Sequence, residues 1–306
     1  LSSLSQKAAS PRKEPVEAGA PGHGCGHSAL GTGSLAAVLA VKEYLVENKK
    51  DGTIIYFGCP AEEGAGSKQF MARAGMFDNV DFVYTWHPAT INAVECNHSN
   101  AIMGANFEFK GVSSHAGGSP EAGKNALYAA TCGLNAVNAI RETFVDGEHI
   151  RFHPIITEGG AAVNAIPETA KVESYVRGAS FDSIRDYNKK VNLALAGAAA
   201  SLGCNVELDD HPGYFPLNND TNMTEILTEA MEAVTGPGTV TRGAWGTGCT
   251  DMGDVSAIMP AIHPHASGSI GTGHGKDYYV ADKKAGCLYP AQCLTVAASM
   301  PLLHHT

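Results

Sequence analysis

The stretch Asp81-Phe82-Val83-Tyr84-Thr85-Trp86-His87 is a short, largely apolar run that ends where Pro88 begins. An earlier and nearly unbroken apolar run covers residues 53–59, and such runs are typical of strands buried on both faces of a parallel sheet. Apolar residues at helical spacing precede the earlier run over residues 30–46, and a short helical segment follows it over residues 66–74. The order helix, strand, helix, strand predicts an α/β fold with a mostly parallel sheet.

The pattern changes at about residue 102, where strands and helices follow one another in a different order. We expect strands over residues 102–112, 150–157, 168–178 and 204–209, with helices over residues 123–142 and 180–202. The resulting β-α-β-β-α-β order is the split, ferredoxin-like one. We therefore predict a separate domain at residues 102–210, inserted into an α/β domain that comprises residues 1–101 and 211–306.

The α/β pattern resumes after the inserted domain. The expected elements are a helix over residues 221–234, a glycine-rich loop over residues 243–253, an apolar strand over residues 255–263 and a closing helix over residues 281–299. These segments complete the interrupted domain.

Composition excludes several classes of partner. The chain has 306 residues and a formal net charge of −10, which argues against nucleic acid or an anionic membrane surface as the main partner. No apolar run approaches the roughly 20 residues of a membrane span, and the first residues lack the apolar centre of a signal peptide. The eight cysteines form no CxxC pair, so we expect reduced thiols and a cytoplasmic protein.

Metal-binding side chains gather where we expect one edge of the sheet. Glu62 and Glu63 follow the earlier apolar run, and His87 is the last residue of the later one. Cys25 and His27 stand in a glycine-rich loop before the first helix. Because sites in open parallel sheets form at the carboxyl ends of strands, these side chains predict a site for Zn²⁺ or a similar ion.

The adjacent glutamates Glu62 and Glu63 suggest two separate roles, one as a metal ligand and one as a general base. Side chains of neighbouring residues point in different directions, so one carboxylate can hold a metal while the other faces a water molecule on it. A metal lowers the pKa of that water toward about 7, and a nearby carboxylate can take its proton and return it to a leaving amine. This is the chemistry of amide hydrolysis.

Six segments of the chain carry a resemblance to known proteins. They are GHGCGHSALGT, GCPAEEG, YTWHP, FKGVSSHAGGSPEAGKNAL, GAAVNAIPE and GTGCTDMGDVS. These segments resemble peptidase family M20, the metallopeptidases that include aminoacylases, dipeptidases and glutamate-releasing carboxypeptidases. The resemblance is strongest to the amidohydrolase subfamily and extends over nearly the whole chain. It implies a zinc-peptidase-like catalytic domain with an inserted lid that also serves dimerisation.

The resemblance assigns roles to six residues of the predicted metal site. It implies two divalent metal ions, with zinc or manganese favoured and cobalt as a further option. Glu62 corresponds to the general base, and Cys25 to the ligand that bridges the two metals. The last ligand of the family is a histidine near the C-terminus, for which His274 is a better match than His263 or His265. The implied metal ligands are Cys25, His27, Glu63, His87 and His274.

Three residues of the inserted domain resemble family residues that contact the substrate. His115 matches a histidine that reaches the partner subunit's active site and stabilises the oxyanion, while Asn164 and Arg177 match residues that hold the substrate's carbonyl and carboxylate. From the residues alone, a turn histidine, a strand-edge amide and a surface arginine are equally good interpretations. Asp251 and Asp254 suit loop-structuring carboxylates first, and outer-shell partners of a ligand histidine second.

The expected activity is metal-dependent hydrolysis of a small amide substrate that carries a carboxylate. Candidate substrates are an N-acyl amino acid, an aminobenzoyl-glutamate-like conjugate and a dipeptide. We expect a homodimer through the inserted domain, with a hetero-oligomer as the other option. A non-catalytic subunit of the same fold that supports a partner chain remains an alternative. A thiol hydrolase that uses Cys25 and His27 is disfavoured because the sequence shows no third orienting group.

The sequence departs from the family pattern in two places. Relatives have further residues at the start of the catalytic domain, whereas only 24 residues precede Cys25 here, which suggests an N-terminal truncation. Ser28 follows the ligand His27 where an amide or acid is usual. The first departure affects the completeness and stability of the sheet more than the identity of the ligands, and the second is the smaller of the two.

Overall fold

The computed structural model describes residues 24–64, 66–94, 99–243, 246, 248–275 and 277–303. The chain divides into two compact units. Unit 1 comprises Leu1–His98, Leu217–Gly246 and Thr250–Thr306, and unit 2 comprises Ser99–Pro216 with Thr247–Cys249. The predicted inserted domain, residues 102–210, lies within unit 2, and its role as a lid stays a prediction.

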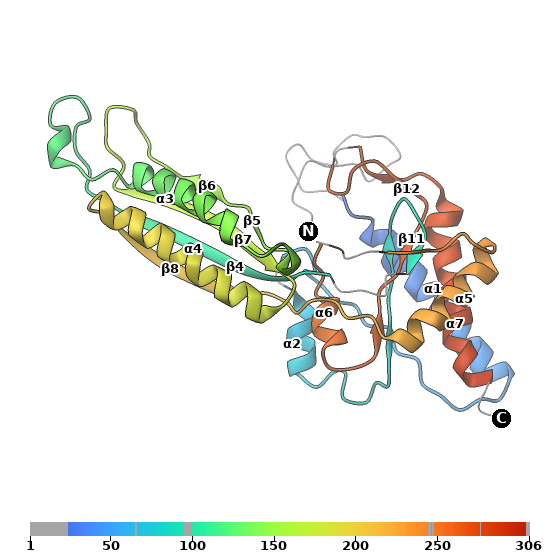
Figure 1. The fold of residues 1–306 in the computed structure, drawn as a ribbon. Coiled ribbons are helices and arrows are strands. Elements are labelled where there is room, and N and C mark those ends of the chain that lie inside the picture. The colour runs from blue at the N-terminus through green and yellow to red at the C-terminus, as the bar shows by residue number, and fades with distance from the viewer. Residues whose placement is uncertain are drawn as a thin grey trace. The chain divides into compact units, whose positions relative to one another are not determined.

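Unit 1 is an α/β structure whose short strands pair mainly in parallel (Figure 1). Parallel pairs join β1 to β10, β2 to β11 and β3 to β9, while β11–β3 and β12–β13 are antiparallel. The predicted fold class is therefore confirmed. The helices are α1 (His27–Glu47), α2 (Ser67–Arg73), α5 (Thr221–Thr235), α6 (Met252–Ser256) and α7 (Tyr289–Leu303), with a π-helical turn at Lys284–Leu288 before α7. The strands are β1 (Val83–Tyr84), β2 (His87–Pro88), β3 (Ala93–Val94), β9 (Thr241–Arg242), β10 (Ala261–Ile262), β11 (His265–Ala266), β12 (Ser269–Ile270) and β13 (Tyr279–Val280).

Helix α1 packs through a stripe of residues spaced four apart. The buried residues of this stripe are Ala29, Gly33, Ala37, Val41 and Leu45. Because a spacing of four keeps side chains on one face of a helix, the stripe can lie against α7, its main helical neighbour. By length and composition, α1 is the one helix in the described ranges that could cross a membrane. That is weak evidence for a membrane span, since the buried stripe is what a core helix also shows.

All three strands predicted in unit 1 are wrong or shortened. The run at residues 81–87 forms only the two-residue strands β1 and β2, and β2 extends through Pro88. Residues 53–59 form no strand, because in the described part of the chain no strand pairs with their backbone. Only Phe57 of this run packs against the core, and Ile55 is exposed. The strand predicted over residues 255–263 begins late, since Val255 belongs to α6 and the ladder starts only after Pro260, which has no N–H to donate.

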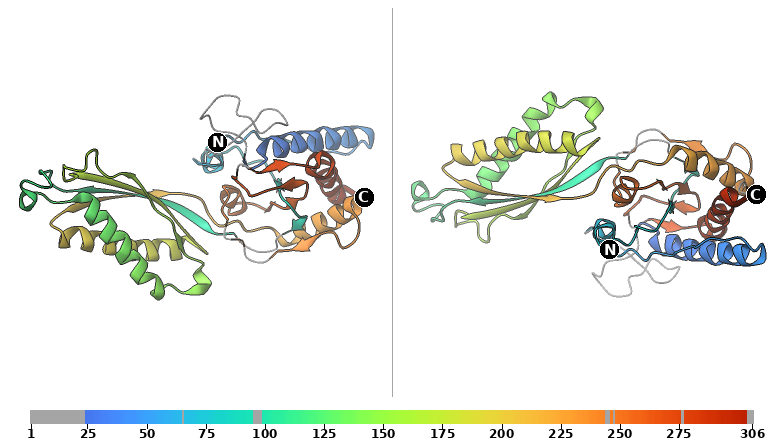
Figure 2. Two further views of the ribbon diagram at one scale, coloured as in Figure 1. Left: turned by 90° about the horizontal axis from the view of Figure 1, so that it is seen from above. Right: turned by 90° about the horizontal axis from the view of Figure 1, so that it is seen from below.

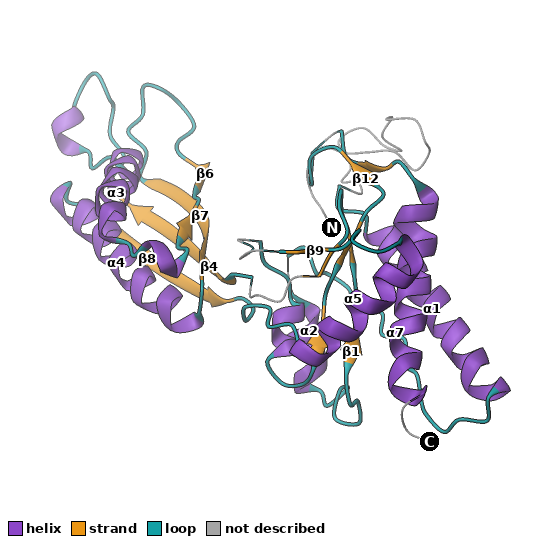
Figure 3. Ribbon diagram, turned by 45° about the vertical axis from the view of Figure 1, so that its right-hand side comes forward, coloured by secondary structure: helices purple, strands orange, loops and turns teal. Residues whose placement is uncertain are grey.

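Unit 2 has the predicted β-α-β-β-α-β order, except that the strand predicted over residues 150–157 is divided into two short strands, β5 and β6. Its sheet runs β5-β7-β4-β8, with β6 also paired to β7, and all these pairs are antiparallel. Helices α3 and α4 cover one face of this sheet, as Figures 2 and 3 show from different sides. The elements are β4 (Ala101–Lys110), α3 (Ala126–Ile140), β5 (Arg151–Phe152), β6 (Ile155–Glu158), β7 (Thr169–Gly178), α4 (Phe181–Ser201) and β8 (Asn205–Pro212), with single 3₁₀ turns at Pro120–Ala122, Arg141–Thr143 and Asp146–Glu148.

Side-chain caps explain where three of the helices begin. Asn125 accepts a hydrogen bond from the Tyr128 N–H at the start of α3, and Ser180 accepts one from the Ser183 N–H at the start of α4. Asp220 does the same for α5. Each cap satisfies an N–H that has no partner within its helix, which contributes about 1 kcal/mol.

The core of unit 2 lies between its sheet and its two helices, and Phe109 is fully buried there. Phe109→Ala is expected to lower the free energy of unfolding by about 3–5 kcal/mol, because it removes apolar surface and leaves a cavity. Tyr128→Ala is the matched control, since the Tyr128 side chain on α3 is 64% exposed. Urea denaturation of both variants checks this, and equal losses of stability would contradict the assignment of Phe109 to the core.

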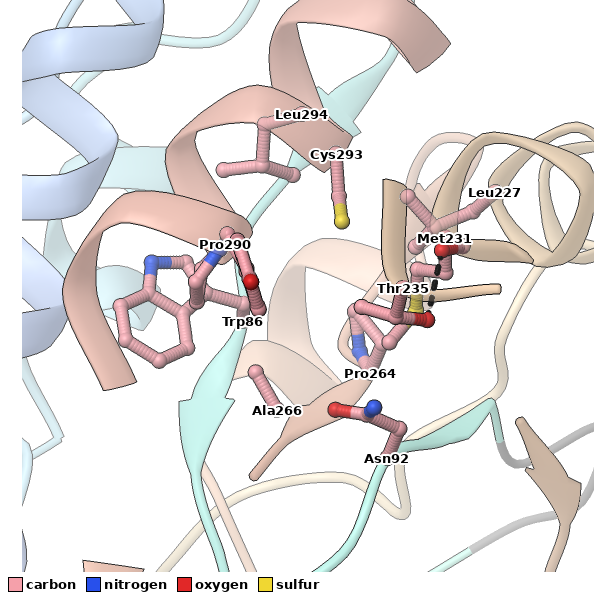
Figure 4. Close-up of a pocket in the computed structure, with 11 residues that line it drawn as sticks. Trp86, Asn92, Leu227, Met231, Thr235, Pro264, Ala266, Pro290, Cys293 and Leu294 are labelled. Atoms are coloured by element: carbon pink, nitrogen blue, oxygen red, sulfur yellow. Dashed lines mark hydrogen bonds between the residues drawn. The ribbon is translucent and has the colours of Figure 1, made fainter. Parts of the chain in front are cut away.

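A small cavity of about 10 Å³ lies inside unit 1 between α5, α7 and the strands (Figure 4). Its walls are mostly apolar and include Trp86, Leu227 and Leu294. This volume is close to the room that one water molecule needs. The cavity is therefore an imperfection of core packing and is too small for an amide substrate.

Candidate metal centre

The parallel strands of unit 1 bring three histidines together. His87 of β2 is in register with His265 of β11, and His263 precedes His265 by two residues. Successive residues of a strand point to opposite faces, so these histidines share one face, while Trp86 and Ala266 line the cavity on the other. The His87 ring lies 5.8 Å from the His263 ring and 5.9 Å from the His265 ring, measured between centroids.

The loop before α1 depends on a glycine between its two predicted ligands. Gly26 has a φ of 81°, and a Cβ there would lie 2.6 Å from the Tyr278 hydroxyl and 2.9 Å from the Pro88 side chain. Only glycine tolerates both the left-handed backbone and this close approach. The turn at Gly26 lets Cys25 and His27 face the same centre, with Cys25 Sγ 3.2 Å from His87 Nε2.

A tight turn presents the two glutamates. Ala61 has a left-handed φ of 59°, and its carbonyl accepts hydrogen bonds from the N–H groups of Gly64 and Gly66. The turn places Glu62 Oε2 at 3.6 Å and Glu63 Oε1 at 3.7 Å from His27 Nε2. Both carboxylates therefore border the same imidazole.

His274 reaches the centre from the C-terminal part of unit 1. Its N–H donates to the Gly24 carbonyl at 2.7 Å, which ties the two loops together. Its Nε2 lies 3.4 Å from Glu63 Oε1. The structure thus brings together all five predicted ligands and Glu62, in overlapping groups whose ligand atoms lie within 4.8 Å of one another.

Two observations show that these residues fit a metal ion. Glu63 Oε1 is buried and has no hydrogen-bond partner among the described residues, although it lies between the Nε2 atoms of His27 and His274. His87 Nδ1 lies 2.8 Å from the Pro88 carbonyl, which can only accept, so Nδ1 carries the proton. The lone pair of His87 Nε2 then faces the centre, as in metal-bound histidines.

The charges of the cluster favour a cation. Burial raises the pKa of the Cys25 thiol, and the Glu63 carboxylate raises it further. Burial, followed by Asp251 and Glu63, raises the pKa of Glu62 to about 7. Burial lowers the pKa of His87 to about 4, which keeps its imidazole in the neutral form that binds metals. A divalent cation would offset this crowding of acidic groups.

Two residues near Glu62 form a pair that the sequence did not reveal. Asp251 is fully buried and pairs with Lys68 at 2.5 Å, rather than with a ligand histidine. Lys68 gave no signal, because a lysine on a short helix is typical of a solvated face, and the pairing depends on tertiary structure.

His115 and Asn164 are neighbours in unit 2. His115 forms an isolated bridge with Ala165, and the Asn164 carbonyl accepts from the Ala116 N–H. His115 Nδ1 accepts the N–H groups of Gly117 at 3.2 Å and Gly118 at 2.9 Å. A neutral His115 therefore carries its proton on Nε2, the nitrogen that can donate to a ligand.

Arg177 lies on β7 in unit 2, with its guanidinium held by two neighbours. Its Nε donates to His153 Nε2 at 3.2 Å, and one terminal nitrogen donates to Cys249 Sγ at 3.4 Å. These contacts fix the orientation of the guanidinium. Sequence reasoning found Arg177 but neither partner, because the partners come from distant parts of the chain.

Comparison with known proteins gives one family match. The model of Peptidase family M20/M25/M40 matches residues 6–289. One of the subunits of the p-aminobenzoyl-glutamate hydrolase of Escherichia coli is 36% identical over 208 residues, which are 68% of this chain and 43% of that protein. The Xaa-Arg dipeptidase of Mus musculus is 31% identical over 279 residues, which are 88% of this chain and 63% of that protein.

A solved structure supports the fold. The Bacillus subtilis YXEP protein, described as a dinuclear metal-binding peptidase from the M20 family, aligns with a TM-score of 0.67 at 18% identity. The alignment covers 96% of this chain and 77% of that one. The chain spans less than two thirds of the length of either sequence relative, 43% of the first and 63% of the second.

Proposed function

The chain belongs to Peptidase family M20/M25/M40, and on that premise we propose that it is a metal-dependent amidohydrolase. One observation carries the proposal. Glu63 Oε1 is buried and has no hydrogen-bond partner among the described residues, yet the Nε2 atoms of His27 and His274 face it. A second carboxylate, that of Glu62, lies near the same His27 nitrogen. The substrate is an N-acyl amino acid, an aminobenzoyl-glutamate-like conjugate or a dipeptide. The names of the bacterial hydrolase and the mouse dipeptidase support this range.

The residues proposed to hold two divalent ions combine one thiol, three imidazoles and one carboxylate. This donor set suits zinc or manganese, with cobalt as a further option. When bound, such ions polarise an amide carbonyl and make water more acidic. The ligands are Cys25, His27, Glu63, His87 and His274.

The proposed proton transfer runs through Glu62. Its carboxylate takes a proton from the attacking water, the new C–O bond forms, and the same proton passes to the amine as the C–N bond breaks. The proposal gives His115 Nε2–H the role of donor to the oxyanion in the active site of the partner subunit, consistent with the proton that its Nδ1 contacts leave on Nε2. Asn164 and Arg177 are proposed to hold the substrate, with the Arg177 guanidinium suited to a carboxylate.

We also propose that the chain assembles as a homodimer through unit 2 in the cytoplasm. A hetero-oligomer is the competing arrangement, since the Escherichia coli relative is named as one subunit of a hydrolase. Sedimentation of the purified chain is expected to give twice the monomer mass. A monomer that enlarges only when a partner chain is added would favour the hetero-oligomer.

Chelation tests the proposed activity. The metal-loaded protein is expected to hydrolyse at least one member of a panel of N-acyl amino acids, dipeptides and aminobenzoyl-glutamate, and to lose that activity when a chelator removes its metal. Adding zinc, manganese or cobalt back should restore the rate. Activity that survives complete removal of metal would refute the proposal. A folded, metal-loaded protein inactive on the whole panel would instead support a non-catalytic subunit.

A further inference from the structure

A buried ion pair lies beside the proposed base and has no part in the mechanism above. Lys68 Nζ is 2.5 Å from Asp251 Oδ1, and the backbone N–H of Lys68 donates to Asp251 Oδ2 at 3.3 Å. The Asp251 side chain is fully buried, and the Lys68 side chain is 13% exposed. Asp251 thus holds the first turn of α2 by both a side chain and the backbone.

The pair connects the segment that follows Glu62 in the chain with the segment that leads into α6. On one side, the turn that carries Glu62 leads into α2, where Lys68 is the second residue. On the other side, Asp251 is the residue directly before α6. The pair therefore ties the segment that follows Glu62 to the start of α6.

Apolar packing already holds α2 and α6 together. Met71 and Ala72 of α2 pack in the same cluster as Met252 and Val255 of α6. A buried ion pair gains little stability over an apolar replacement of similar volume, because desolvation offsets the attraction between the charges. Packing thus accounts for the contact between the helices, whereas the pair fixes how the first turn of α2 is placed.

We propose that Lys68 and Asp251 are positioning residues for Glu62, holding the turn that carries Glu62 so that the carboxylate stays at the centre. This inference rests on the proposed function, in which Glu62 is the base. A displacement of about 1 Å in a reacting group can cost about 10²-fold in rate. The pair acts through the turn, without contact to the substrate.

The test compares variants that remove the pair in different ways. Lys68→Met is expected to lower kcat by about 10²-fold with KM and bound metal unchanged, and to speed hydrogen exchange at the Gly66 N–H, which bonds to the Ala61 carbonyl. Lys68→Arg should restore most of kcat, because arginine can still pair with Asp251. Lys171→Met is the control, since Lys171 forms an exposed ion pair with Glu158 in unit 2.

A second variant is needed because Lys68→Met leaves the Asp251 charge buried without its partner, which destabilises the fold. The double variant Lys68→Met with Asp251→Leu removes both charges and should fold, yet show the same loss of kcat and faster exchange at Gly66. Wild-type kcat and exchange in either folded variant would overturn the inference, and so would a loss of bound metal that parallels the loss of kcat. If the wild type hydrolyses nothing but Gly66 exchange still rises in the variants, the proposed function fails while the pair's hold on the turn stands.

Discussion

Glu62→Gln is expected to lower kcat by about 10²- to 10⁴-fold, the range that a positioned general base contributes. Glutamine keeps the shape of the side chain, but an amide oxygen cannot take the proton of the attacking water. Glu62 is proposed to hold no metal, so metal content per chain should stay at the wild-type value. Steady-state kinetics on the best substrate and metal analysis of the same sample make the measurement.

A matched control sharpens this prediction. Glu63→Gln changes the adjacent residue by the same single group, but it alters the carboxylate whose Oε1 lies near His27 and His274. It should lower both metal content and activity, whereas Glu62→Gln lowers activity alone. An undiminished rate in Glu62→Gln would remove the base assignment, and equal metal loss in the two variants would make Glu62 a ligand.

The fold could be predicted from the sequence wherever a long periodic pattern of apolar residues specified a helix or a strand. Helices α3 and α4 and strands β4 and β7 were expected within a few residues of their bounds, because each buries one face against the core of unit 2. The run at residues 53–59 shows the limit of such patterns. Its composition suits a buried strand, but a strand also needs a neighbouring backbone, and the pattern of one segment does not reveal whether a neighbour is present.

The residues of the candidate site also fall into two groups, those that the sequence predicted and those that only the structure revealed. The gathering of Cys25, His27, Glu63 and His87 was predicted from strand ends and a glycine-rich loop, and the side chains do gather. The reason given for Glu63 was wrong, because the run before it forms no strand and a tight turn at Ala61 presents it instead. The pairing of Lys68 with Asp251 crosses 183 residues of sequence and depends on how α2 and α6 pack. No local pattern distinguishes such a lysine from a solvated one, so contacts of this kind emerge only from the structure.

His87→Ala is expected to weaken metal binding by at least about 10²-fold. Removing only a group that hydrogen-bonds to a metal ligand costs up to about 10²-fold in affinity, and removing the ligand itself should cost at least as much. His87 lies on β2 with its Nδ1–H held by the Pro88 carbonyl, so its Nε2 is already oriented toward Cys25 Sγ. Alanine removes that nitrogen, so the proposed site loses one of its three imidazole ligands. Metal titration of the chelator-treated protein, followed by metal analysis, measures the loss.

His265→Ala is the matched control, because His265 is in register with His87 on the neighbouring strand yet belongs to none of the ligand groups found among the described residues. If metal binding depends on which nitrogens face the ion, His87→Ala loses metal and His265→Ala retains it. If metal binding depends only on the number of imidazoles nearby, both variants lose metal alike, and the assignment of His87 as a ligand fails.

His274→Ala completes the comparison, since it removes the nitrogen that faces Glu63 Oε1 at 3.4 Å. Wild-type metal content in that variant, together with a loss in His265→Ala, would transfer the fifth ligand position from His274 to His265.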